Sequence, residues 1–200
     1  MNVGAACYWT SMVIGTFFGI IMVSVAGLGK LLPWHPMNKL LVTTFETTAG
    51  PFFGLPARPL RLAVGIVELV AGLGLLVGLW SVQTGDAQKH VDLLLILDGV
   101  GLATVLVQAM VFHAVVEGAG QIFPYGVMII LLCTFVGCRL QMTPLRSLGP
   151  SCEFLAIRFL YVCITGLLLS LFARRAWGAS TETLVANNKK IKEMQAQLMG

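Results

Sequence analysis

Apolar residues in this chain gather into long segments instead of alternating with polar residues. Five segments of about 20 residues stand out, and stretches with glycine, proline and charged residues separate them: 9–32, 59–80, 91–115, 123–140 and 154–173. A helix of about 20 apolar residues is long enough to cross a bilayer. Because the backbone must satisfy its own hydrogen bonds in hydrocarbon, each such segment has to be helical. The pattern predicts an all-α, polytopic transmembrane helical bundle.

The composition is typical of a membrane protein and indicates that lipid, not water, surrounds much of its surface. Hydrophobic residues make up 57% of the chain and charged residues only 11%, with a mean hydropathy of +0.87. A soluble domain has roughly 25% charged residues, because its surface faces water. We therefore expect the lipid bilayer to surround the bundle. The net charge is +4, but aromatic residues are not interspersed among the basic residues. No nucleic-acid partner is therefore expected.

Two regions follow from this pattern, a transmembrane bundle over residues 1–178 and a polar C-terminal tail over residues 179–200. Ser180 or Thr181 can cap a tail helix. The apolar residues of the tail fall on one stripe and are predicted to contact a partner: Leu184, Ile191, Met194 and Leu198. An isolated helix this short is marginal in water, so it is held by another subunit or by the membrane surface, or it is frayed.

The connection between the first two spans, residues 33–58, holds an apolar stretch from Met37 to Phe45 that is too short to span. An interfacial or re-entrant segment is one interpretation. An ordered loop lying on the bundle is the other.

The basic residues indicate the orientation. Five spans put the termini on opposite sides, and we call the side of the C-terminus the tail side. Nine of the 13 basic residues fall there: Lys30, Lys39, Arg58, Arg61, Arg174, Arg175, Lys189, Lys190 and Lys192. The positive-inside rule then places the C-terminus in the cytoplasm or matrix. A mitochondrial inner membrane or endoplasmic reticulum location is favoured. The first segment is too long for the core of a cleaved signal peptide.

Charged residues inside spans are costly, about 2.5–3.5 kcal/mol each on insertion scales, so each needs a partner or a watery cavity. In the tail-side half, four residues form a candidate polar cluster: Lys30, Glu68, His113 and Glu117. Lys30 and Glu68 should differ by roughly 9–14 Å in depth, a gap that two long side chains can nearly close. Internal ion pairs that set helix register are one interpretation. A pocket for a quinone headgroup, or a proton relay, is the other.

A second candidate cluster lies in the opposite half of the predicted bundle, where Asp98, Arg139 and Arg158 fall at compatible depths. Close helix packing is expected at small residues, because a missing side chain lets two backbones approach each other. These glycines are Gly15, Gly19, Gly65, Gly72, Gly74 and Gly78.

Catalytic and metal sites are not expected. No H-x-E, H-E-x-x-H or G-x-S-x-G motif occurs, and of the three histidines only His113 lies near the interior of a span. The five cysteines have an odd count and no C-x-x-C spacing. We expect them to act as small apolar packing residues, without a disulfide or a metal ion.

Short motifs carry a family resemblance over residues 10–142. Ala-Gly-Leu-Gly-Lys closes the first span at Lys30, Gly-Ile-Val-Glu-Leu surrounds Glu68, His113 lies late in the third span, and Cys-Arg-Leu at 138–140 ends the fourth. Together they resemble the DoxX-like superfamily of small four-helix membrane proteins, including the branch of the nicotinic-receptor assembly chaperone. In that family a lysine of the first helix and a glutamate of the second recur, where Lys30 and Glu68 stand. The fifth span and the tail depart from the four-helix pattern.

Three functions follow as hypotheses. The first is a non-catalytic accessory subunit or assembly factor of a larger membrane complex, for example of the mitochondrial respiratory chain, with bound lipid but no cofactor. The alternative is a quinone-linked redox subunit of DoxX or DoxD type that binds quinone near Glu68 and His113. A small transporter is a weaker third, because no span is broken at mid-membrane and no inverted repeat is visible.

Overall fold

The chain folds into helices throughout the part that the structure describes. The computed structural model describes residues 3–84, 88–118, 120, 122–142 and 150–199, and every regular element in these ranges is helical. The side chains of Ile191, Met194 and Leu198, from the predicted contact stripe, lie outside the described residues. The predicted all-α helical bundle is confirmed.

Four helical segments of the described residues are long and apolar enough to cross a bilayer. The first is continuous over Val3–Leu31 and consists of α1 (Val3–Ile21), the π-helical η1 (Met22–Gly27) and α2 (Leu28–Leu31). The others are α5 (Ala57–Thr84), α6 (Gln88–Glu117) and α7 (Ile122–Met142). All four correspond to predicted spans, and most of their ends extend past the predicted ones, because helices continue beyond the apolar residues that hydropathy detects.

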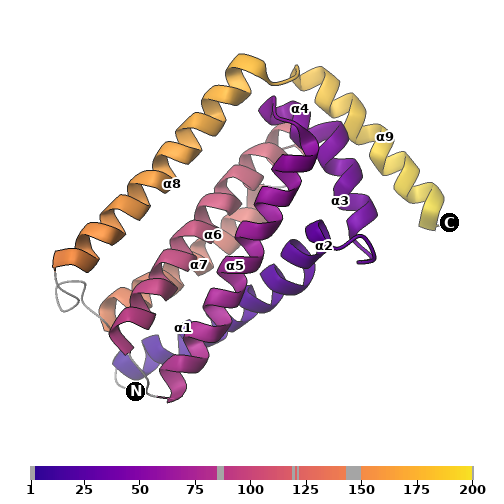
Figure 1. Ribbon diagram of the computed structural model, residues 1–200. Helices are drawn as coiled ribbons and strands as arrows, with labels where there is room; N and C mark the ends of the chain where they lie inside the picture. Colours follow the sequence, from indigo (N-terminus) through magenta and orange to yellow (C-terminus); the bar gives the residue numbers. More distant parts are fainter. Residues whose placement is uncertain (1–2, 85–87, 119, 121, 143–149, 200) are drawn as a thin grey trace.

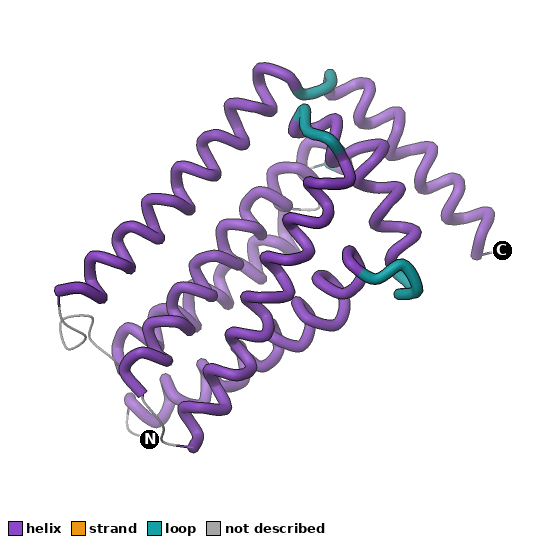
Figure 2. Tube along the Cα trace, viewed as in Figure 1, coloured by secondary structure: helices purple, strands orange, loops and turns teal. Residues whose placement is uncertain are grey.

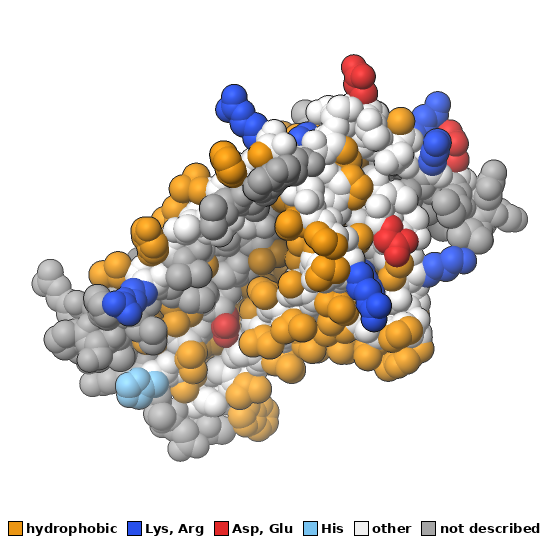
Figure 3. Space-filling model, turned by 45° about the horizontal axis from the view of Figure 1, so that its top comes forward, with side chains coloured by type: hydrophobic (Ala, Val, Ile, Leu, Met, Phe, Trp, Pro, Cys, Tyr) orange, Lys and Arg blue, Asp and Glu red, His pale blue; other side chains and the backbone are white. Residues whose placement is uncertain are grey.

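These four segments pack side by side as one bundle (Figure 1). Large apolar side chains fill its centre, and those with almost no exposed surface include Phe18, Leu75, Leu95, Leu102, Leu132 and Phe135. Many apolar side chains remain on the outside, and Figure 3 shows many hydrophobic side chains gathered along the lower side of the face in view. An outer surface of this kind suits hydrocarbon as the solvent.

The connection between the first two spans is mostly helical. It contains α3 (Asn38–Thr44), the π-helical η2 (Phe45–Ala49) and α4 (Gly50–Phe53), and loops surround these short helices (Figure 2). Gly54 ends α4 with a φ of 65°, a left-handed conformation that favours glycine. The segment packs against α5, α8 and α9 at one end of the bundle.

Two further helices follow, α8 (Pro150–Trp177) and α9 (Thr181–Met199). α8 runs alongside the bundle (Figure 1) and packs on α6 and α4. Its 28 residues are enough to span a bilayer, and its role as a fifth span is taken up as a proposal below. α9 leaves at an angle, and the backbone N–H of Thr183 donates to Ser180 Oγ (3.3 Å), which is an N-cap bond.

Candidate functional site: a polar cavity at the tail-side end

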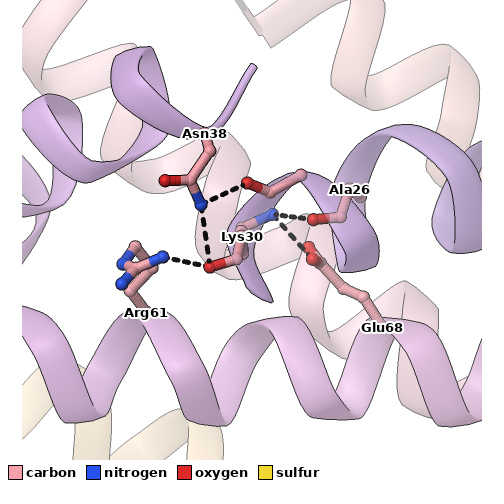
Figure 4. A network of polar contacts seen from close by, with 6 residues as sticks. Ala26, Lys30, Asn38, Arg61 and Glu68 are labelled. Carbon is pink, nitrogen blue, oxygen red and sulfur yellow. Dashed lines mark hydrogen bonds and ion pairs between the residues drawn. The ribbon is translucent and has the colours of Figure 1, made fainter. Parts of the chain in front are cut away.

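A buried ion pair joins the first and second spans. Lys30 Nζ lies 2.6 Å from Glu68 Oε2, and each side chain is at most 10% exposed (Figure 4). The gap in depth expected from sequence is closed because the backbones touch here. A Cβ on Gly65 would lie only 2.9 Å from Lys30 Cβ, so this glycine brings α2 against α5.

The end of the first span is tied down by donors from two other elements. The last carbonyl groups of a helix lack partners within the helix. Asn38 of α3 donates through Nδ2 to Gly29 O at 3.0 Å, and Arg61 of α5 donates to Lys30 O (Figure 4). The position of Lys30 is therefore held from both sides.

Two π-helical segments lie in this part of the fold, and one of them contacts the ion pair. Lys30 Nζ also donates to Ala26 O (3.3 Å), a carbonyl within η1. Gly27, the last residue of η1, packs so closely on α5 that a Cβ would lie 2.9 Å from Leu69 Cβ. Single π turns inside longer helices are frequent at functional sites. Neither π segment has a periodic signal in the sequence.

His113 and Glu117 lie near the end of α6, together with a tyrosine of α7. His113 Nδ1 is 3.2 Å from Glu117 Oε1, but the alignment is not that of a hydrogen bond, and the contact is an ion pair only when His113 is protonated. The His113 ring stacks on Tyr125, with centroids 4.9 Å apart and an interplanar angle of 19°. Tyr125 adds a hydroxyl that the predicted cluster lacked.

All four residues of the first predicted cluster line one cavity of about 520 Å³, which we call the tail-side cavity. Its walls come mainly from η1, α2, α3, η2, α5, α6 and α7 and are mostly apolar. The polar residues that line it include Lys30, Glu68, Gln108, His113, Glu117 and Tyr125. A small-molecule site typically has a volume of roughly 300–1,000 Å³ and a few convergent polar groups in an apolar wall. The tail-side cavity has these properties.

The tail helix forms part of the same wall. Asn188 of α9 lines the cavity, and Asn187 donates through Nδ2 to Thr47 O of η2 at 2.8 Å. Leu184 has no exposed surface and packs in an apolar cluster with Phe45, Phe52 and Phe112. The tail is therefore docked on the bundle at the beginning of α9. A frayed tail, the alternative interpretation of the sequence, does not apply to this part.

The second predicted cluster needs a correction. Arg139 is almost fully buried, and its Nη1 lies 3.1 Å from Asp92 Oδ1 instead of pairing with Asp98. Asp92 is near the start of α6 and Arg139 near the end of the antiparallel α7, so the two lie at similar depth. Asp98 lies roughly 9 Å further along α6 by the rise per residue. Arg158 lies on α8 with an exposed side chain.

Asp98 instead packs where α5 has a glycine. A Cβ on Gly74 would collide with the Asp98 carboxylate, and one on Gly78 would lie 2.7 Å from Leu95 Cδ2. These two glycines make room for α6. Gly15 faces Leu79 and Phe135 side chains across the core.

Gly19 and Gly72 meet each other across α1 and α5. A Cβ on Gly19 would lie 3.2 Å from Gly72 O, and a Cβ on Gly72 would lie 3.1 Å from Gly19 O. Each of the six predicted packing glycines therefore faces a neighbouring element at close range.

Several residues of these sites are not evident from the sequence. Asp92 lies at the edge of the predicted span, where a charged residue is expected to be interfacial. Its position about one turn inside the helix could nevertheless have suggested a buried partner. Tyr125 has a similar position at the start of the fourth span. Asn38 and Arg61 donate hydrogen bonds to backbone carbonyl groups, and no sequence motif predicts such contacts.

Within the described residues, no group of three or more His, Cys, Asp or Glu side chains is placed to hold a metal ion. No protein-family model, no curated protein and no solved structure matches the chain.

Proposed function

We propose that this protein is a membrane-embedded binding protein, non-catalytic by itself, that holds a lipid-soluble molecule with a polar head in the tail-side cavity. The observation that carries the proposal is the convergence of Lys30, Glu68, His113 and Glu117 on one mostly apolar cavity of about 520 Å³. Polar residues inside a membrane are costly and generally mark a ligand or ion pathway.

The chemistry of the wall favours a neutral head with hydrogen-bonding groups. Lys30 and Glu68 are 2.6 Å apart and neutralise each other. The second carboxylate of the wall, Glu117, lies 3.2 Å from His113 Nδ1 and forms an ion pair with it when His113 is protonated. His113 Nδ1 is buried without a well-aligned hydrogen bond, and Gln108 and Tyr125 bring further polar groups. A quinone headgroup, with carbonyl oxygens on a flat ring and an apolar tail, has this chemistry.

The first experiment identifies what the cavity contains. The protein is purified in mild detergent, and co-purified small molecules are extracted and measured by mass spectrometry. We expect about one ligand per chain, enriched over bulk lipid, in wild type and in Ile130→Ala, whose side chain faces outward. His113→Leu should lose the ligand. An extract that matches bulk lipid in all three proteins would contradict the proposal.

A second candidate function is an accessory subunit or assembly factor of a larger membrane complex. One observation favours it: α8 stands at the side of the bundle and leaves most of its described apolar side chains exposed. These are Ile157, Leu160, Tyr161, Ile164, Leu168, Leu171 and Phe172. As a fifth span, α8 contacts the bundle on one side and offers its other side to lipid or to helices of other subunits. Gentle solubilisation should then give a large particle, and migration as a monomer of 21.5 kDa would count against this role.

The proposed topology has five spans, with the C-terminus on the cytoplasmic or matrix side and the start of α1 on the other. Arg174 and Arg175 in the last turn of α8 support it, because basic residues at a span's end favour that side. We also propose kinship with the DoxX-like superfamily. The support for this is the pairing of Lys30 with Glu68, which stand at the positions where a lysine and a glutamate recur among members of that family.

A further inference from the structure

A group of cysteine and other polar side chains lies at the opposite end of the bundle, where α1 begins and α7 ends. The two helices run antiparallel (Figure 1). Met12 Sδ lies 3.7 Å from Arg139 Nη2. Nearer the end, the Cys7 thiol donates to Gln141 Oε1 at 3.1 Å. The Cys7 side chain is therefore directed at α7.

A second thiol lies on that same face of α7. Cys138 precedes Gln141 by three residues, a spacing that places both on one side of a helix. The Cys138 thiol lies close enough to the Cys7 thiol for the two to interact. Both cysteines are only half-buried, so a reagent can reach them.

We propose that Cys7 and Cys138 are a thiol pair that oxidises to a disulfide joining α1 to α7. The oxidant is itself a disulfide, either of a thiol oxidoreductase or of glutathione. In the exchange, the two cysteines lose two protons and two electrons and one S–S bond forms between them. The S–S bond of the oxidant breaks and yields two thiols.

The position of the pair suits this chemistry. Cys7 is the fifth residue of α1 and Cys138 lies four residues before the end of α7, so each is roughly 6 Å inside its helix end. In the topology proposed above, this end faces away from the cytoplasm or matrix. Disulfides form and persist mainly in oxidising compartments on that side of a membrane. The contact between the two thiols does not depend on the tail-side cavity or its ligand.

The test counts free thiols in the full-length protein. Cys133, Cys152 and Cys163 are replaced by alanine, so that only Cys7 and Cys138 remain. The solubilised protein is treated with oxidised glutathione, denatured and labelled with a polyethylene-glycol maleimide. The gel should show two labels before oxidation, none after it and two again after reduction with dithiothreitol. The intact mass of the oxidised protein should show no bound glutathione.

A matched variant keeps Cys133 and Cys163 and lacks the other three cysteines. It should still carry two labels, or two glutathione adducts, after the same treatment, with no internal disulfide. For the Cys7 and Cys138 protein, three results would overturn the proposal. These are two labels remaining after oxidation, one glutathione on each cysteine, or a covalent dimer of two chains.

Discussion

Lys30 and Glu68 form a buried ion pair with 2.6 Å between Nζ and Oε2, although 38 residues separate them in the chain. Removing one partner of such a pair leaves an uncompensated charge, which costs about 3–5 kcal/mol. We expect Glu68→Gln to lower the free energy of unfolding in detergent by about that much.

The double variant Lys30→Met with Glu68→Leu tests the same pair from the other direction. Replacing both charges by apolar side chains removes the unpaired charge, and such replacements are often neutral. The stability lost in Glu68→Gln should therefore be largely recovered, as measured by thermal unfolding. A double variant no more stable than the single one would show that the pair is not an isolated unit.

The carboxylate partner of Arg139 can be identified by mutation. Asp92 Oδ1 lies 3.1 Å from Arg139 Nη1, and Arg139 is 1% exposed. A double-mutant cycle with Arg139→Leu should give a larger coupling energy for Asp92→Asn than for Asp98→Asn. The measurement is denaturant unfolding in micelles. Equal coupling to both aspartates would contradict the pairing seen in the structure.

The glycine contact between α1 and α5 predicts a steric effect. A Cβ on Gly19 would lie 2.7 Å from two atoms of the Leu76 side chain and 3.2 Å from Gly72 O. Overpacking of this kind typically costs about 1–3 kcal/mol, so Gly19→Ala should lower the thermal midpoint. Gly137→Ala is the matched control, because a Cβ at that position would have no neighbouring atom within 4 Å. A similar loss in both variants would argue against close packing at Gly19.

Docking of the tail depends on Leu184, which has no exposed surface. Truncation of a buried leucine to alanine costs about 2–5 kcal/mol, and we expect Leu184→Ala to release α9 from the bundle. Trypsin should then cleave faster at the exposed Lys189 and Lys190. Val185→Ala is the control, since Val185 is 46% exposed, and its cleavage rate should equal that of wild type.

The fold was largely predictable because one physical requirement dominates the sequence. Helices that cross hydrocarbon need long apolar runs. Among the described residues, the four helical segments long and apolar enough to span a bilayer are visible as such runs. The π-helical η1 and η2 were not predictable. A π turn adds one residue to a helical turn without changing the apolar character of the segment.

The candidate site was predictable in its charges and not in its contacts. The cost of a buried charge selects opposite partners, and this predicted Lys30 and Glu68 as partners despite the expected difference in depth. The same reasoning favours Asp98 for Arg139, because residues at the edge of a predicted span are expected to be interfacial. Which residue faces which depends on helix rotation, and close-packing glycines such as Gly65 set that rotation.

Binding of a lipid-soluble molecule in the tail-side cavity is tested most directly by a titration. The probe is decylubiquinone, added to the purified protein in detergent and followed by calorimetry. Ala109 lines the cavity, and Ala109→Trp should fill it. We predict one saturable site per chain in wild type and none in a folded Ala109→Trp variant. Unsaturable partitioning in both proteins, or equal binding by both, would contradict a binding role for the cavity.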